Sequence, residues 1–133
     1  MSLPVLIVED NPADLDLLKL AFDAHGIVRE IIALDDGDKA VRFLERLDSK
    51  RPADLVVMDL NVPKRDGIEL LTRFRTHPLF EDVPIVVFTS SESPAERSRA
   101  ERLGVQAYLR KPMELDEFMA LGATFKELLN RAG

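Results

Sequence analysis

The sequence contains no cysteine. This absence excludes disulfides, thiol catalysis and cysteine-based zinc sites. No apolar run is long enough to cross a bilayer, and the short apolar N-terminus lacks the basic leader and the cleavage pattern of a secretory signal. We therefore expect a cytoplasmic protein that makes no contact with a membrane.

Basic residues are also fewer than acidic ones. The chain has 18 Lys and Arg against 24 Asp and Glu, which gives a net charge of -6. A surface of this sign makes nucleic acid an unexpected partner, although a local basic patch stays open. If the carboxylates gather in one place, their charge favours a divalent cation as the bound species.

Short apolar runs alternate with segments of helical periodicity along the 133 residues. The runs predict strands at residues 5–8, 28–34, 55–58, 84–88 and 106–109. Helices are predicted at residues 13–24, 39–47, 66–75, 94–103 and 115–129. Five strand–helix repeats indicate a flavodoxin-like α/β fold, a five-stranded parallel sheet with helices on both faces. We expect a single domain over residues 1–133, without an output domain.

The run Leu55–Met58 ends in Asp59, and turn residues follow at once. The carboxyl end of a buried parallel strand is where open α/β sheets bind ligands. Asp59 is therefore the first candidate for a functional residue. Taken alone, it could equally be an aspartate that shapes the turn.

Three other strand ends carry reactive groups. The first predicted strand is followed by Glu9-Asp10, the fourth by Thr89, and the fifth by Lys111. In a parallel sheet these groups share one edge with Asp59, where a hard cation such as Mg²⁺ would neutralise the carboxylates. A metal, an ammonium and a hydroxyl around one carboxylate are suited to phosphoryl transfer onto that carboxylate.

Each of these residues also has an ordinary structural interpretation. Glu9-Asp10 could cap a helix, Thr89 could cap the next helix or hold a turn, and Lys111 could be a solvated surface lysine. The specific signal is their joint occurrence, in this order, at four strand ends.

With these residues in place, the chain resembles a response-regulator receiver domain over essentially all of its length. The residues that carry the resemblance are Glu9-Asp10, Asp59, Pro63, Gly67, Thr89 and Lys111-Pro112. The resemblance implies that Asp59 is the phosphoacceptor. It also implies that Asp10, Asp59 and the backbone carbonyl of Asn61 hold Mg²⁺, with Glu9 acting directly or through water.

The resemblance implies roles for the remaining groups too. Lys111 would pair with the phosphoryl group, and Thr89 would bond to it after phosphorylation. Tyr108 would then turn inward as the switch aromatic, whereas the alternative for Tyr108 is a half-buried tyrosine at a strand edge. The bond between Lys111 and Pro112 would be a cis peptide, because proline tolerates the cis form.

Residues 9–14, 59–67 and 88–91 are similar to the stand-alone regulators of bacterial phytochrome kinases. This similarity implies that a sensor histidine kinase is the partner and that output occurs by protein binding or phosphorelay. The apolar stripe of the last helix, from Leu115 to Leu129, favours a homodimer through that helix. The alternative is that the stripe is simply buried in the core.

Other functions compete with this interpretation. A phosphohydrolase with an aspartate nucleophile usually has a second acid two residues on, but that position is Asn61. A flavin- or nucleotide-binding module needs a phosphate-cradling first loop, and Glu9-Asp10 would repel a phosphate. A receiver that only binds partners would not need the complete set of site residues. We therefore expect no enzymatic activity beyond the protein's own phosphorylation and dephosphorylation.

Overall fold

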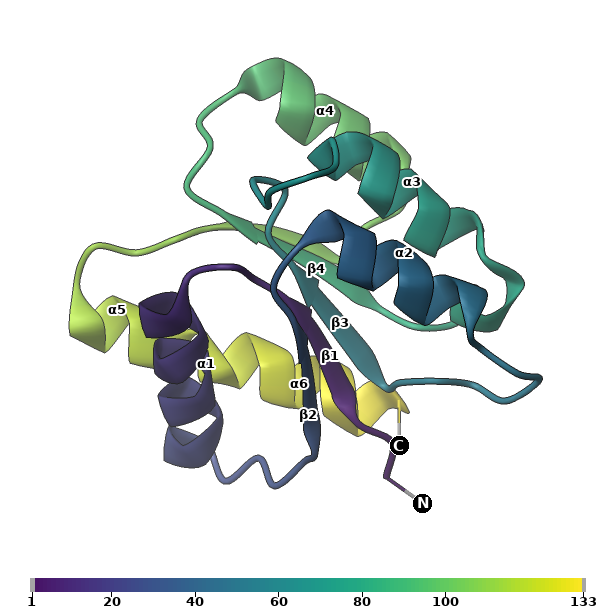
Figure 1. Ribbon diagram of the computed structural model, residues 1–133. Coiled ribbons are helices and arrows are strands. Elements are labelled where there is room, and N and C mark those ends of the chain that lie inside the picture. The colour runs from purple at the N-terminus through teal and green to yellow at the C-terminus, as the bar shows by residue number, and fades with distance from the viewer. Residues whose placement is uncertain (1, 133) are drawn as a thin grey trace.

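The computed structural model describes residues 2–132 of the chain. They contain one parallel sheet of five strands in the order β2-β1-β3-β4-β5 (Figure 1). The strands are β1 (Val5–Val8), β2 (Ile31–Leu34), β3 (Leu55–Met58), β4 (Ile85–Thr89) and β5 (Ala107–Arg110). The predicted five-stranded parallel sheet is thus confirmed.

Helices cover both faces of this sheet. They are α1 (Pro12–Ala24), α2 (Gly37–Glu45), α3 (Gly67–Thr76), α4 (Pro94–Arg102), α5 (Leu115–Ala120) and α6 (Gly122–Ala132), with a 3-10 turn η1 (Pro78–Phe80) before β4. Helices α1, α5 and α6 lie on one face, and α2, α3 and α4 lie on the other (Figure 1). Among the described residues, no helix has the length and apolarity that a membrane span requires.

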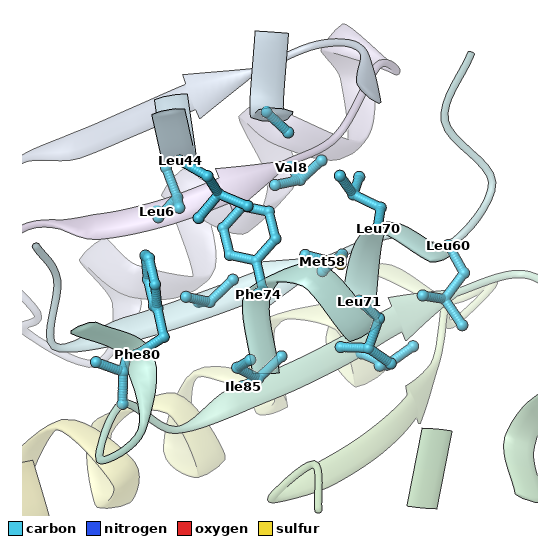
Figure 2. Packing of buried hydrophobic residues seen from close by; sticks show 14 of the residues in the cluster. Leu6, Val8, Leu44, Met58, Leu60, Leu70, Leu71, Phe74, Phe80 and Ile85 are labelled. Atoms are coloured by element: carbon cyan, nitrogen blue, oxygen red, sulfur yellow. The ribbon is translucent and has the colours of Figure 1, made fainter. Parts of the chain in front are cut away.

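The core is divided into two layers by the sheet. Strands β1, β3 and β4 are buried throughout, as expected for apolar runs that are covered on both faces. Alternate residues of each strand face opposite layers, so Leu6 packs under α2 and α3 while Ile7 packs under α1. Figure 2 shows Phe74 of α3 and Leu44 of α2 pointing into the first of these layers.

Polar N-caps fix where the helices begin. The side chain of Asn11 accepts hydrogen bonds from the backbone N–H groups of Ala13 and Asp14, so α1 starts at Pro12. Because Asn11 provides this cap, the structure does not use Glu9-Asp10 as one. Helices α2, α3 and α4 are capped in the same way by Asp36, Asp66 and Ser93.

Two predicted elements differ clearly in extent, whereas the bounds of the others agree to within two residues. Strand β2 begins at Ile31 rather than at residue 28; Val28 is 91% exposed, and the Arg29 side chain binds Asp54. The last helix is interrupted at Leu121, which separates α5 from α6. At this interruption Gly122 lies against His25, since a Cβ on Gly122 would fall 2.2 Å from the His25 Cδ2 atom.

The apolar stripe of the last helix is mostly part of the core. Phe118, Phe125, Leu128 and Leu129 are buried against the sheet and α1. Leu115 is 60% exposed and the preceding Met113 is 96% exposed. Burial therefore explains most of the stripe, and only its beginning faces solvent.

Candidate functional site

Asp59 lies directly after β3, at the edge where all five strands present their carboxyl ends. Its side chain is buried, and its backbone N–H donates a 2.9 Å hydrogen bond to the carbonyl of Val8 on β1. The carboxylate atom Oδ1 accepts a hydrogen bond of 2.9 Å from the backbone N–H of Asn61. The carboxylate is thereby fixed by both the neighbouring strand and its own loop.

The close packing of the loop after Asp59 requires Gly67. A Cβ atom at this position would lie 1.9 Å from the carbonyl oxygen of Leu60, well inside van der Waals contact. Glycine lets the start of α3 pass this close to the loop backbone. The loop that carries Asn61 is therefore held against the first residue of α3.

Lys111 brings a positive charge to Asp59. Its ammonium Nζ lies 2.8 Å from Asp59 Oδ2, 2.8 Å from Glu9 Oε1 and 2.8 Å from Asp14 Oδ2. The backbone N–H of Lys111 donates a 2.9 Å hydrogen bond to the carbonyl of Thr89, which fixes the loop after β5 beside β4. One ammonium is thus shared among three carboxylates.

The structure contradicts one expectation about Lys111. None of the described residues has a cis peptide bond, so Pro112 follows Lys111 through a trans peptide. The trans form is the intrinsically favoured one even before proline. The ammonium reaches all three carboxylates in this form, so the ion pairs do not require the cis isomer.

Glu9, Asp10 and Asp59 form an acidic cluster that fits a divalent cation. Each offers a carboxylate oxygen, and the three oxygens lie within 4.8 Å of one another. Glu9 and Asp59 are buried, whereas Asp10 is exposed and leaves a path from solvent. Carboxylate oxygens are the ligands that hard cations such as Mg²⁺ and Mn²⁺ take. The described residues therefore provide a candidate metal centre.

The pKa values of Glu9 and Lys111 reflect the excess of negative charge in this site. Burial, assisted by the negative charge of Asp59, raises the pKa of Glu9 from 4.5 to about 7, although Lys111 and the N–H of Asn11 oppose the shift. Burial disfavours the charge of Lys111, but hydrogen bonds with Asp14, Asp59 and Glu9 outweigh it and raise the pKa of this lysine. Lys111 therefore keeps its positive charge, and additional positive charge would stabilise the carboxylates of the site.

Thr89 is fully buried at the end of β4. Its hydroxyl oxygen accepts a 3.2 Å hydrogen bond from the N–H of Ser91 and so holds the turn that leads to α4. The cap of α4 is Ser93, so capping by Thr89 is not observed. Thr89 thus stands between β4 and the loop that borders the site.

Tyr108 belongs to β5, and its ring packs beside α4. The Arg97 guanidinium lies 5.3 Å from the centroid of its ring, and a hollow of about 360 Å³ beside it is lined by Ser91, Arg97 and Arg110 among others. Burial, together with the negative charge of Glu96, raises the pKa of Tyr108. Within the described chain, the Tyr108 hydroxyl and Glu96 Oε1 are buried without a hydrogen-bond partner.

Asp14 is the member of the site that the sequence did not reveal. It lies in the first turn of α1 and pairs with Lys111, which is 97 residues away in sequence. No local motif predicts a contact across this separation. The only signal was its place one helical turn after the acidic pair, on the helix that starts at the same sheet edge.

Comparison with known proteins identifies the family. Residues 5–121 match the model of the response regulator receiver domain. The chain belongs to this family. The receiver domain is 34% identical over 121 residues to the response regulator Rcp1 of Synechocystis sp., an alignment that covers 88% of this chain and 82% of that protein.

Solved structures agree with this assignment. The phosphorylated cyanobacterial phytochrome response regulator RcpA superimposes with a TM-score of 0.86 and 26% identity, covering 100% of this chain and 97% of the other. The Mn²⁺-bound form of Rcp1 gives a TM-score of 0.81 and 32% identity, covering 92% and 91%. The resemblance to receiver domains and to phytochrome response regulators is confirmed, and a divalent-metal site suits the acidic cluster.

Proposed function

We propose that this receiver domain accepts a phosphoryl group on Asp59 from a sensor histidine kinase. The observation that carries the proposal is the position of the Asp59 carboxylate, which lies 2.8 Å from the Lys111 ammonium and within the acidic cluster at the sheet edge. Glu9 is also buried beside this ammonium and belongs to the same cluster. Asp59 differs from Glu9 in that it directly follows β3, the central strand of the sheet, where the family resemblance places the phosphoacceptor.

The chemistry follows from these contacts. An oxygen of the Asp59 carboxylate attacks the phosphorus of a phosphohistidine. A P–O bond forms, the P–N bond breaks, and the imidazole leaves with that electron pair. Negative charge on the phosphoryl oxygens is then next to the Lys111 ammonium, which stabilises it electrostatically. The surrounding burial strengthens this interaction, because the local dielectric is lower than that of water.

Mg²⁺ is the proposed metal. Glu9, Asp10 and Asp59 would hold it, together with the backbone carbonyl of Asn61. When bound, Mg²⁺ supplies positive charge that offsets the carboxylates and the incoming phosphoryl oxygens. The pKa of the buried Glu9 carboxylate is raised to about 7, so the positive charge around it does not compensate for its burial. This shortage of positive charge supports the assignment.

Thr89 and Tyr108 are proposed to transmit the state of Asp59 to the surface. The Thr89 hydroxyl, which accepts a hydrogen bond from the Ser91 N–H, would move to donate one to a phosphoryl oxygen. This movement would break the bond to Ser91 and release the turn before α4. Tyr108 lies beside that turn and α4, and among residues 2–132 its buried hydroxyl has no hydrogen-bond partner. A movement of the turn would therefore change the packing of Tyr108 and the surface around the adjacent hollow.

The partners follow from the same proposal. The kinase is proposed to be of the phytochrome type, because Rcp1 and RcpA are similar over most of the chain. Output of this receiver domain would occur by protein binding or phosphorelay in the cytoplasm, without turnover of an external substrate. The exposed Met113 and Leu115 support a homodimer through the last helix.

Intact-mass measurement tests the phosphoacceptor. Wild type, Asp59→Asn and Asp35→Asn are incubated with acetyl phosphate, with Mg²⁺ or with EDTA. We expect one phosphoryl group on wild type and on Asp35→Asn with Mg²⁺, and none on Asp59→Asn or with EDTA. Asp35 is an exposed carboxylate paired with Lys39 and serves as the matched control. A metal-dependent adduct on Asp59→Asn would show that another residue is the acceptor.

A further inference from the structure

Asp14 differs from the other two carboxylates that contact Lys111. Glu9 and Asp59 belong to the group of candidate metal ligands, and Asp14 does not. Its Oδ2 atom is nevertheless as near to the ammonium as theirs, at 2.8 Å. The ammonium therefore has two partners that a metal would need and one that a metal would leave free.

The local structure keeps Asp14 in place. The residue lies in the first turn of α1, and its backbone N–H donates to the capping side chain of Asn11 at 3.3 Å. A negative charge at this end of a helix is stabilised by the unpaired N–H groups and the helix dipole. With 20% of its side chain exposed, Asp14 is more accessible to solvent than Glu9, whose side chain is 1% exposed.

We propose that Asp14 is a positioning residue that holds the Lys111 ammonium when a divalent cation occupies Glu9 and Asp59. This inference rests on the function proposed above. A bound cation takes up the charge of Glu9 and Asp59 and repels the ammonium. Asp14 then retains the ammonium at the edge of the cluster, where the phosphoryl group will need it. Without Asp14, the metal would have to displace Lys111 with no replacement partner.

The alternative is that the pair only ties α1 to the loop after β5, as any ion pair between distant segments does. The two accounts differ in how Asp14 affects metal binding. In the positioning account the effect passes through Lys111 and disappears when Lys111 is absent. In the structural account, removal of Asp14 lowers stability but does not change metal affinity by way of the ammonium.

A double-mutant cycle separates them. Mg²⁺ affinity is measured by calorimetry for wild type, Asp14→Asn, Lys111→Met and the double variant, with circular dichroism confirming that each is folded. Asp16→Asn, which removes an exposed carboxylate from the same helix, is the charge control. Asp14→Asn should weaken Mg²⁺ binding about tenfold, the scale of one lost hydrogen bond between charged groups. In the Lys111→Met background the same change should have an effect of no more than about twofold, that of a screened charge.

Three results would overturn the inference. Equal losses of Mg²⁺ affinity with and without Lys111 would show that the Asp14 charge acts on the metal directly rather than through the ammonium. Unchanged Mg²⁺ affinity in Asp14→Asn would show that the ion pair is only structural. In both cases wild type still binds Mg²⁺, and the proposed function stands. If wild type binds no Mg²⁺ at all, the proposed metal centre fails and the inference fails with it.

Discussion

The two ends of β3 both carry a buried aspartate, and they differ in the balance of charge around it. Asp54 precedes the strand and Asp59 follows it, and each is 4% exposed. Asp54 Oδ2 lies 2.7 Å from Arg29 Nη1 and accepts a 3.0 Å hydrogen bond from the N–H of Leu3, while Arg51 lies 3.8 Å from its other oxygen. One carboxylate is thus matched by two guanidinium groups.

At the other end the proportion is reversed. Asp59 shares the single ammonium of Lys111 with Glu9 and Asp14, and Asp10 adds a further carboxylate nearby. A buried aspartate is therefore no sign of function by itself. The excess of negative charge at the carboxyl edge of the sheet distinguishes a site that takes up a cation from an ion pair that closes the fold.

The largest expected contrast is in stability. Asp54→Asn leaves Arg29, whose side chain is 14% exposed, without its carboxylate, and breaking a largely buried pair of this kind costs about 3 kcal/mol of unfolding free energy. Asp59→Asn relieves repulsion in the metal-free cluster, so we expect no loss of stability there. Urea denaturation of both variants in EDTA measures the difference. Equal destabilisation by the two substitutions would contradict the distinction between the two ends.

The second contrast concerns pH. Because the pKa of Glu9 is raised from 4.5 to about 7, its proton favours the folded metal-free protein; this contribution is complete below pH 4.5 and is lost as pH rises through about 7. A proton on Glu9 also competes with metal. Below pH 7 we therefore expect Mg²⁺ affinity to fall by up to about tenfold per unit.

Calorimetric titration between about pH 6 and about pH 8, one unit either side of that pKa, measures this dependence. The variant Glu9→Gln is the control, since it should bind Mg²⁺ more weakly and with a flatter pH profile. A wild-type profile as flat as that of the variant would count against proton competition at Glu9.

The smallest contrast lies within the Asp54 end itself. Arg51 lies farther from Asp54 than Arg29 does, at 3.8 Å, and its side chain is 35% exposed; its hydrogen bonds go to the carbonyls of Ala53 and Asp82. We expect Arg51→Ala to lower the unfolding free energy by about 1 kcal/mol, clearly less than Asp54→Asn. Thermal and urea unfolding of the two variants side by side would show whether Arg29 alone balances Asp54.

The sequence indicated the sheet and most of the site because the signals were local. An apolar run ending in a carboxylate places Asp59 at a strand end, and parallel connections bring Glu9, Thr89 and Lys111 to the same edge. Contacts between distant segments were not predictable in this way. Asp14 reaches Lys111 only through the packing of α1 beside the loop after β5, and Gly122, next to the interruption of the last helix, lies against His25 at the far end of α1.

The prediction for Lys111-Pro112 failed for a different reason. The expected cis bond came from resemblance to a family, and the residues themselves allow both isomers. The trans bond observed here still places the ammonium among the carboxylates. The shared motif correctly predicted which side chains meet, but it did not predict the isomer of the peptide bond next to one of them.

Mg²⁺ titration of wild type, Asp59→Asn and Asp54→Asn tests the central claim most directly, because it compares the two ends of β3 in one measurement. Each protein is held at a temperature at which circular dichroism shows it folded. The account predicts one Mg²⁺ bound with the same affinity by wild type and Asp54→Asn, and binding at least about a hundredfold weaker by Asp59→Asn, which lacks a charged metal ligand. Unchanged binding by Asp59→Asn, or an equal loss in Asp54→Asn, would contradict it.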